Sequence, residues 1–420
     1  MRIPTSVALA ALGGALVLGL TVAPAAQAAP ATSGCTTDAF GIAGKYGEFV
    51  LGDDVHSPDA EGAVAVGGNA DFSGGFSVGN ELTAAQVDAL PGRTSLVVRG
   101  DLVNGGSATV VMKGNAVVGG AVKDRALEMH NGTFAKKADL IDFDGEFAKL
   151  RAYSDALAKE AATSGASVSL DGNRLTLTGT DSGRNVFSVD ASKLEKAKEV
   201  FVKVPAGATT IVNVTGQSYD MATAGTTGFF LSGGKDFVLD DKLQSADDGA
   251  VRAKLLWNFP NADKIVKNSQ AAWPGSVLAP RAHLELGTAA PVNGSVWVAS
   301  LHGSGGAETH RFPFTGCLPE VPGTGTPTPG TTPSGTPSTT PPATTTPAPS
   351  ATPSGTATPS GTPSDSATPG APAPSASPSQ PEGDLATTGS GNMIPITVGG
   401  AAVVAAGAAL VVVARRRKRA

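Results

Sequence analysis

Histidines and paired acids are the side chains of this 420-residue chain that could carry catalysis or hold a metal ion. The five histidines are His56, His130, His283, His302 and His310, and the three acid pairs are Asp53-Asp54, Asp240-Asp241 and Asp247-Asp248. His302 and His310 flank Glu308 without a metalloprotease spacing such as His-Glu-x-x-His. The sequence therefore predicts no enzyme, no catalytic residue, no metal and no cofactor. Adjacent acids are usually solvated in loops and only sometimes act as glycosidase carboxylates, so a carbohydrate-active enzyme is one alternative.

A second candidate for chemistry lies near the C-terminus, in the pentapeptide Leu385-Ala386-Thr387-Thr388-Gly389. An uncharged apolar run, 393–414, and a basic cluster in 415–420 follow it. These three pieces in this order resemble the sorting signal of a Gram-positive sortase, with Ala386 where the commoner pattern has Pro. The resemblance implies that residues 385–389 are recognised by a sortase, whose cysteine thiolate attacks the Thr388 carbonyl and transfers it to peptidoglycan.

The apolar run is long enough to cross a membrane. About 20 apolar residues span roughly 30 Å of hydrocarbon, and residues 393–414 provide 22. The bases of 415–420 should stay in the cytoplasm, which places the rest of the chain outside. We expect a single-pass precursor that is held in the membrane until processing; an ordinary single-pass anchor is the alternative.

The N-terminus has the pattern of a signal peptide. Arg2 precedes an apolar stretch, 7–22, and the small-x-small site Ala26-Gln27-Ala28. We expect residues 1–28 to be removed on secretion, with an uncleaved anchor as the alternative.

The two cysteines, Cys35 and Cys317, lie at the edges of the segment predicted to fold, 35–317. In a secreted protein an even pair in these positions is typical of a disulfide bond. Free thiols and a metal site are the alternatives, although no histidine cluster accompanies the two sulfurs.

Composition limits the class of partner. The signal peptide and tail contain six of the 31 Lys and Arg residues and none of the 36 acids, so the mature net charge is about −11. This acidity argues against nucleic acid as a partner.

Residues 318–384 are rich in Pro, Thr, Ser and Gly, with 17 prolines in 321–384. Such a linker cannot bury a core and is expected to be an extended, disordered stalk.

Short β-favouring runs that end in Gly-Asn or Gly-Asp recur between residues 61 and 122, in 63–70, 96–102 and 110–116. The spacing is irregular, 32 and then 14 residues, and the runs fit either antiparallel hairpins or the coils of a solenoid. The theme returns in 275–279 and 294–298, offset by 19 residues, which is about one turn of a β-helix. Further strands are predicted at 167–170, 174–178, 185–189, 199–204, 210–214 and 255–260.

One convincing helix is predicted between residues 139 and 162. Its apolar face is formed by Phe143, Phe147, Leu150, Leu157 and Ala161. The acids at its start, in 139–144, are favoured by the positive end of the helix dipole. Residues 142–146 could be taken for part of a calcium loop, but they lack the full EF-hand ligand set.

Four segments together resemble the choice-of-anchor A domain of bacterial surface proteins: Asp59-Ala60-Glu61-Gly62-Ala63-Val64-Ala65-Val66-Gly67-Gly68-Asn69, Ile211-Val212-Asn213-Val214-Thr215-Gly216, Leu256-Trp257-Asn258-Phe259-Pro260 and Gly275-Ser276-Val277-Leu278-Ala279-Pro280. The resemblance covers about 40–313. It implies a mainly β fold, a right-handed parallel β-helix with one long helix packed along it, and an adhesive role with an extracellular ligand such as a host or matrix protein or a glycan. A structural coat protein is the other non-enzymatic alternative.

Overall fold

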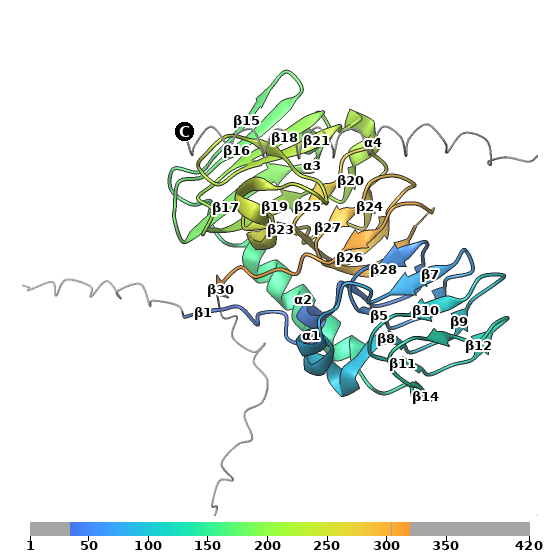
Figure 1. Cartoon of the computed structure of the whole chain (residues 1–420). Coiled ribbons are helices and arrows are strands. Elements are labelled where there is room, and N and C mark those ends of the chain that lie inside the picture. The colour runs from blue at the N-terminus through green and yellow to red at the C-terminus, as the bar shows by residue number, and fades with distance from the viewer. Residues whose placement is uncertain (1–33, 304, 320–420) are drawn as a thin grey trace, which may run out of the picture. The chain divides into compact units, whose positions relative to one another are not determined.

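Short parallel strands stacked on one another make up most of residues 34–303 and 305–319, the part of the chain that the computed structural model describes (Figure 1). The chain turns around three sides of a coil before it begins the next coil, and each strand pairs with strands of neighbouring coils. We call these sides A, B and C. The mainly β, β-helix-like fold implied by the resemblance is confirmed.

Side A is a ladder of ten strands, paired in parallel throughout. In stacking order they are β14 (Phe134–Lys136), β11 (Asn115–Val118), β8 (Thr94–Val98), β5 (Val64–Val66), β2 (Glu48–Val50), β28 (Val296–His302), β26 (Ser276–Glu285), β23 (Leu255–Asn258), β19 (Thr209–Thr215) and β17 (Arg184–Asp190). Most are buried on both faces, which explains their continuous apolar runs in the sequence.

Side B lies around the next corner of the coil and consists of shorter strands. In order they are β12 (Val122–Lys123), β9 (Leu102–Val103), β6 (Ala70–Asp71), β3 (Asp54–Val55), the second halves of β28 and β26, β24 (Lys264–Val266) and β20 (Ser218–Asp220). The long strands β26 and β28 bend from side A to side B, with a register shift in their pairing between Ala279 and His283.

Side C closes the coil. It contains β13 (Glu128–Met129), β10 (Thr109–Val111), β7 (Phe76–Val78), β4 (Asp59–Ala60), β29 (Thr309–His310), β27 (Val292–Asn293) and β25 (Trp273–Pro274). A separate five-stranded sheet has parallel strands in its centre and an antiparallel strand at each edge. Its order is β15 (Ser167–Asp171), β16 (Arg174–Thr178), β18 (Glu199–Lys203), β21 (Gly228–Ser232) and β22 (Val238–Leu239).

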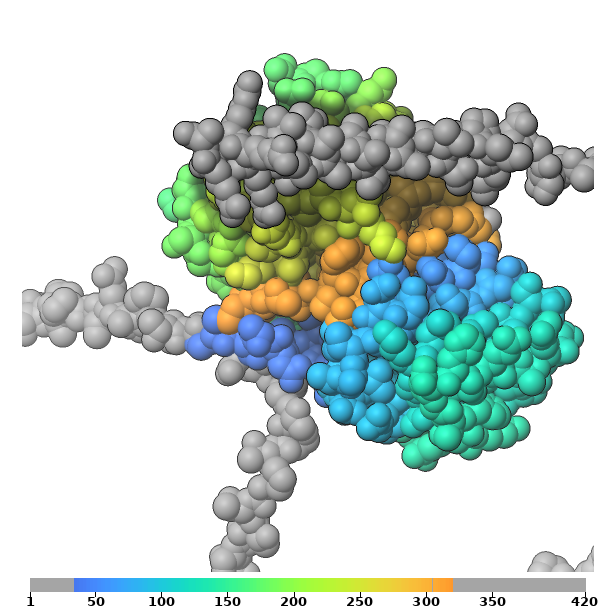
Figure 2. Space-filling view, in the orientation of Figure 1, coloured from blue at the N-terminus to red at the C-terminus, as the bar shows by residue number. Residues whose placement is uncertain are grey.

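The first and last coils of the chain stack directly on each other, at a junction that we call the seam. Strand β28 pairs with β2 on side A and with β3 on side B, while β29 pairs with β4 on side C. Figure 2 shows the result, in which the C-terminal coils in orange lie against the N-terminal coils in blue. The polypeptide therefore begins and ends its solenoid in the middle of the stack.

The helix α2 (Phe143–Ala158) packs along side A, where its apolar face contacts outward side chains of the ladder. Asp142 accepts a hydrogen bond from the Gly145 amide at 3.0 Å, so it is the N-cap of the helix. The predicted helix is confirmed, but it ends before Ala161, which is exposed and therefore wrong as a core residue. Shorter helices not foreseen from the sequence are α1 (Ala84–Ala89), α3 (Ala191–Leu194), α4 (Met221–Ala224) and the 3-10 turns η1 (Ala43–Lys45), η2 (Pro91–Arg93), η3 (Ala246–Gly249) and η4 (Arg252–Lys254).

Two buried asparagines join α2 to side A. Asn213 and Asn258 lie opposite each other in β19 and β23, and the Asn258 amide donates to Asn213 Oδ1 at 2.8 Å. Asn258 also donates to the Ser154 carbonyl and accepts from the Ser154 hydroxyl, while Asn213 donates to the Leu157 carbonyl. Side-chain amides thus fix the helix at one height along the ladder.

We expect Asn258→Ala to lower the free energy of unfolding by about 2–4 kcal/mol, because it leaves the buried Asn213 carbonyl and Ser154 hydroxyl without these partners and creates a small cavity. Urea denaturation of the full chain measures the change. Ser169→Ala, in the half-exposed strand β15, is the control and should change the midpoint little. An Asn258→Ala midpoint equal to wild type would contradict this account of helix docking.

Two of the motifs, Gly68-Asn69 and Gly100-Asp101, form the corner between sides A and B, whereas Gly114-Asn115 leads from side C to side A. Asp53 Oδ1 accepts a hydrogen bond from the backbone N–H of Asn69 at 2.7 Å. Asn69 Oδ1 in turn accepts from the backbone N–H of Asp101 at 2.9 Å. Asp101 Oδ1 continues the ladder by accepting from the Ala121 amide at 2.7 Å. Glycine is needed beside this ladder because a Cβ at Gly68 would lie 2.5 Å from the Gly52 carbonyl carbon of the coil below.

The register of the strands shows which of the predicted repeat offsets correspond to one coil. Val277 pairs with Val296, so the 19-residue offset is one coil, as predicted. The 32-residue step from Val64 to Leu96 is also one coil, enlarged by α1 and η2. The 14-residue step was wrong as a repeat because residues 109–111 lie on side C, and the next side A strand is β11.

The chain ends of the folded unit are tied together. Cys35 and Cys317 form a disulfide bond with their Cα atoms 5.4 Å apart, and β1 (Cys35–Thr36) pairs antiparallel with β30 (Leu318–Pro319). The predicted disulfide is confirmed.

Several predicted segments lie outside the described residues: the signal peptide 1–28, most of the linker 318–384, the pentapeptide 385–389, the apolar run 393–414 and the basic tail 415–420. None of the helices in the described part is both long and apolar enough to cross a membrane.

Candidate functional site

Side B presents a continuous row of outward side chains, which we call the outer row. In stacking order it consists of Asp220, Val266, Glu285, His302, Val55, Asp71, Val103 and Lys123, each in register with the next. All eight are half-buried or exposed. Adjacent strands are about 4.8 Å apart, so the seven steps of the row cover about 33 Å.

The other two sides are covered to a greater extent. Side A is packed under α2. On the C-terminal half of side C, the strand residues Asn293 and His310 are buried. Side B is therefore the side whose outward residues stay accessible from one end of the ladder to the other.

The chemistry of the outer row is mixed. Three valines alternate with three carboxylates, an imidazole and an amine. Two members of the row form ion pairs with residues beside it: Glu285 with Lys264 at 3.1 Å, and Lys123 with Asp101 at 2.7 Å. The hydrogen bond from Lys123 lowers the pKa of Asp101, so both partners are charged at neutral pH. Such a surface offers apolar contacts and hydrogen-bonding groups at a regular spacing.

A segment that contains β22 and η3 covers side C through buried polar contacts. Asp240 accepts from Arg252 at 3.2 Å and from the Asn293 amide at 2.8 Å. The Asn293 carbonyl contacts His310 Nδ1 at 2.9 Å, and Nε2 of the same imidazole contacts Glu308 at 3.2 Å. Burial raises the pKa of Asp240 although Arg252 opposes it, and burial lowers the pKa of His310. These groups connect the segment to the coil.

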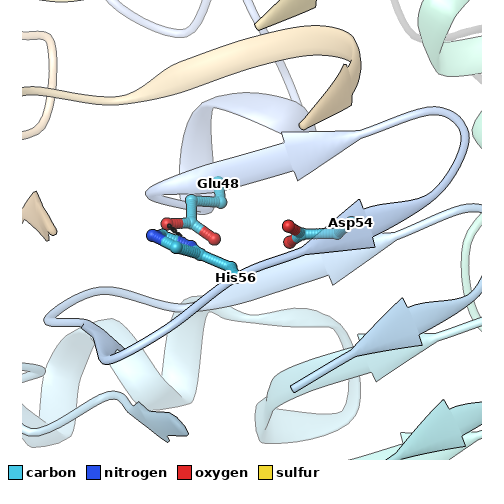
Figure 3. A group of neighbouring side chains, drawn as sticks. All are labelled: Glu48, Asp54 and His56. Atoms are coloured by element: carbon cyan, nitrogen blue, oxygen red, sulfur yellow. Dashed lines mark ion pairs between the residues drawn. The ribbon is translucent and has the colours of Figure 1, made fainter. Parts of the chain in front are cut away.

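Within the described residues, one group of His and acidic side chains is close enough together to hold a metal ion: Glu48, Asp54 and His56. All three are buried, and they point toward one another inside the coil (Figure 3). Their ligand atoms lie within 4.8 Å of one another, and His56 Nδ1 lies 3.3 Å from Glu48 Oε1.

The protonation of this buried group is strongly perturbed. Burial lowers the pKa of His56, but the Glu48 carboxylate and then Asp54 outweigh it and raise the pKa to about 9. Burial and the neighbouring Glu48 raise the pKa of Asp54 well above its ordinary value, although His56 opposes them. Without a bound cation, this environment favours a charged His56 beside Glu48 and disfavours the charged form of Asp54.

The predicted acid pairs are separated by the fold. Asp53 is exposed in the corner ladder, whereas Asp54 is fully buried, so the expectation of a solvated pair was wrong for Asp54. Asp240 is also buried and bound to Arg252, while Asp241 accepts from the Leu243 amide in its own turn. The third pair is on the surface: Asp247 pairs with Lys235 at 3.2 Å, and Asp248 is exposed.

His302 and His310, which are close together in the sequence, lie on different sides of the coil. His302 faces outward on side B, and His310 is buried on side C. A Gly-x-Ser-x-Gly pattern does occur at Gly75-Phe76-Ser77-Val78-Gly79, but it lies along strand β7 and not at the strand-to-helix turn that exposes a nucleophile.

The group of Glu48, Asp54 and His56 is not predicted from the sequence, because its residues form none of the metal-binding motifs that occur on helices and loops. The signal was the alternation Asp54-Val55-His56, since residues two apart in a strand point to the same face. A second sign of a buried polar group was Glu48, a charged residue in a short strand whose other two residues, Phe49 and Val50, are apolar.

Comparisons with known proteins place the folded unit in a family. A family model described as "Putative Ice-binding-like adhesive domain" matches residues 39–311. The chain is similar to a solved ice-binding protein from an Antarctic biological consortium, with 12% identity, a TM-score of 0.26 and coverage of 64% of this chain and 89% of that chain. It is also similar to an ice-binding protein from the Antarctic ascomycete Antarctomyces psychrotrophicus, with 11% identity, a TM-score of 0.25 and coverage of 67% and 99%. No curated protein matches the chain. The family model spans nearly all of the described residues.

Proposed function

Because the chain belongs to the family of ice-binding-like adhesive domains, we propose that its folded unit is an adhesin that binds an extracellular ligand on side B. The observation that carries this proposal is the outer row, which stays accessible while α2 covers side A and the β22–η3 segment covers part of side C. The row also lies on the rigid strands of the ladder, and a ligand that binds there needs little reorganisation of the protein.

The dimensions of side B favour an elongated ligand. Its strands are two or three residues wide, about 10 Å at 3.3 Å per residue, and its length is about 33 Å. This area of roughly 330 Å² is much smaller than the ~800 Å² per partner of a stable protein complex. A linear glycan or an extended peptide segment fits such a strip, and many copies on one cell would increase the avidity.

Sequence patterns near the two ends of the chain support a proposal of display on the cell surface. We propose that residues 1–28 direct secretion and that a sortase joins Thr388 to peptidoglycan. The resemblance to the choice-of-anchor A domain and the order of pentapeptide, apolar run and bases support this proposal. The precursor would be held in the membrane by 393–414, and the linker would carry the adhesive unit away from the wall.

The outer row contains no repeated threonines, and five of its eight residues are charged or ionisable. Ice binding is therefore the weaker alternative, and fold similarity does not determine the ligand.

Val103→Glu tests the proposed binding face. The new carboxylate stands next to Asp71 in the outer row and should weaken binding about tenfold, the effect of removing one contact of about 1.4 kcal/mol. Val110→Glu is the matched control, because Val110 is similarly half-buried but lies on side C. Binding of the purified full chain to a glycan array and to immobilised matrix proteins provides the measurement. Equal losses in both variants, or no binding by the wild type, would contradict the assignment to side B.

A further inference from the structure

The buried group of Glu48, Asp54 and His56 lies inside the coil at the seam. Glu48 is on β2, which pairs with β28 of the last coil, and Asp54 is on β3, which pairs with the same strand. The last coil also supplies two contacts to the group, from Ala307 and Thr309. The group therefore lies where residues separated by about 250 positions in the sequence have to stay together.

The hydrogen bonding of His56 orients its imidazole as in a metal ligand. Its Nε2 lies 3.1 Å from the Ala307 carbonyl, which can only accept, so Nε2 carries a proton. The other nitrogen, Nδ1, then faces the Glu48 carboxylate, and Asp54 completes the group. In metal sites the second ring nitrogen of a histidine ligand almost always donates to a backbone carbonyl or carboxylate in this manner.

The two carboxylates have too few donors. Glu48 Oε1 accepts from the Thr309 hydroxyl at 2.5 Å, but Glu48 Oε2 and both oxygens of Asp54 have no hydrogen-bond partner. The side chains of Glu48 and Asp54 are fully buried. A buried carboxylate without donors is costly unless it is paired or coordinates a metal. Three unpartnered oxygens aimed into one space therefore point to a cation.

We propose that Glu48, Asp54 and His56 bind one divalent transition-metal ion of the zinc class inside the β-helix. Two carboxylates and one imidazole are all zinc ligands, with bonds of about 2.0–2.2 Å that set neighbouring ligand atoms roughly 3.4 Å apart. The 3.3 Å between His56 Nδ1 and Glu48 Oε1 already matches this spacing. Calcium is a poorer fit because it takes six to eight oxygen ligands.

The role of this ion is structural. Its three ligands come from the first coil, and the groups that orient them come from the last coil, because Thr309 donates to Glu48 and Ala307 accepts from His56. The ion would thus hold the seam from the inside. Three protein ligands leave the fourth position of tetrahedral zinc to a small ligand such as water, and because all three side chains are buried, this position is closed to a substrate.

Asp54→Asn and Asp53→Asn form a matched pair of variants for the test. The two aspartates are adjacent in sequence, but Asp54 points into the group and Asp53 points into the corner ladder. The substitution at Asp54 keeps the shape of the side chain while removing its charge, and the substitution at Asp53 keeps the Oδ1 acceptor. The full chain is stripped with a chelator and titrated with ZnCl₂, and bound zinc is counted by plasma mass spectrometry.

The wild type and Asp53→Asn are expected to bind one Zn²⁺ per chain and to show a higher melting temperature with zinc than without it. Asp54→Asn should bind at least about 100-fold more weakly, since loss of even an outer-shell partner costs 10–100-fold, and its melting temperature should not respond to zinc. Anomalous scattering at the zinc edge from wild-type crystals should place the ion between the three side chains, a readout that does not depend on any variant. Failure of the wild type to bind zinc, equal affinity of the two variants, or an ion located elsewhere would overturn the proposal and leave the buried Glu48–His56 ion pair as the whole account.

Discussion

Replacing Thr388 by Ala is expected to abolish covalent attachment of the protein to the cell wall. A sortase has to form an acyl-enzyme at the carbonyl of this residue and then transfer it to an amine of the wall precursor. The pentapeptide is the only part of the chain that the resemblance assigns to recognition, so loss of the threonine should leave the protein in the membrane fraction or in the medium. Leu385→Ala should have the same result. Wall material released by a muramidase and probed for the protein gives the measurement.

Thr387→Ala is the control for this experiment, because Thr387 occupies the variable position of the Leu-Ala-x-Thr-Gly pattern. It should be attached as efficiently as the wild type. Mass spectrometry should find Thr388 bonded to a peptidoglycan fragment. Peptides that run intact through Gly389 as the main species of the wall fraction would contradict attachment by a sortase.

Removal of the disulfide bond should have the largest effect on stability of any single covalent change in the folded unit. Cys35 and Cys317 are separated by 282 positions, and a loop of this length corresponds to a nominal stabilisation of about 5 kcal/mol, an upper value because native strain and residual denatured structure reduce it. For a domain of this size, each kcal/mol shifts the melting temperature by about 2–4 °C, so the double variant Cys35→Ala/Cys317→Ala should melt lower by at most about 10–20 °C.

Calorimetry of the full chain provides this measurement, and peptide mapping without reductant should recover Cys35 and Cys317 as one linked pair. Reduction of the wild type should reproduce the shift seen in the double variant, which separates loss of the bond from any effect of the alanines. Two alkylatable thiols in the native protein, or equal melting temperatures of the wild type and the double variant, would contradict a stabilising disulfide bond between Cys35 and Cys317.

The sequence was sufficient to predict elements with a strong local pattern. The helix α2 has a clear apolar face and an acidic start, and strand β16 coincides with the predicted 174–178. The coil length of 19 residues was visible because two successive coils both begin with Gly-Ser-Val, at Gly275 and at Gly294. Each of these features depends on residues close together in the chain.

Other features depend on contacts between distant residues and could not be predicted in this way. Strands β3, β6 and β9 contain two residues each, too few for an alternating pattern to stand out. The pairing of the last coil with the first leaves no local sign, since either end of a solenoid could be its terminus. Asp54 lies in one of these two-residue strands, and that strand pairs with β28 of the last coil. Its burial therefore has no local sign in the sequence, although its neighbour Asp53 is exposed.

Part of the candidate surface was present in the sequence without being recognised. His302 lies near Glu308 in the sequence without a metal-binding spacing, and its role as one position of a row becomes apparent only when β28 is aligned with β3 and β26. The residues of the outer row come from eight separate places in the chain, and register alone brings them together.

Attachment of living cells under flow tests the central claim, that side B of a wall-displayed domain is adhesive. Cells that display the wild type or Val110→Glu should adhere to a surface coated with the glycan or matrix protein that the purified chain binds. Cells that carry Val103→Glu should detach, and so should cells that carry Thr388→Ala, for which the protein is absent from the wall. Adhesion by Val103→Glu cells at the wild-type level, with equal amounts of protein on the surface, would contradict the account.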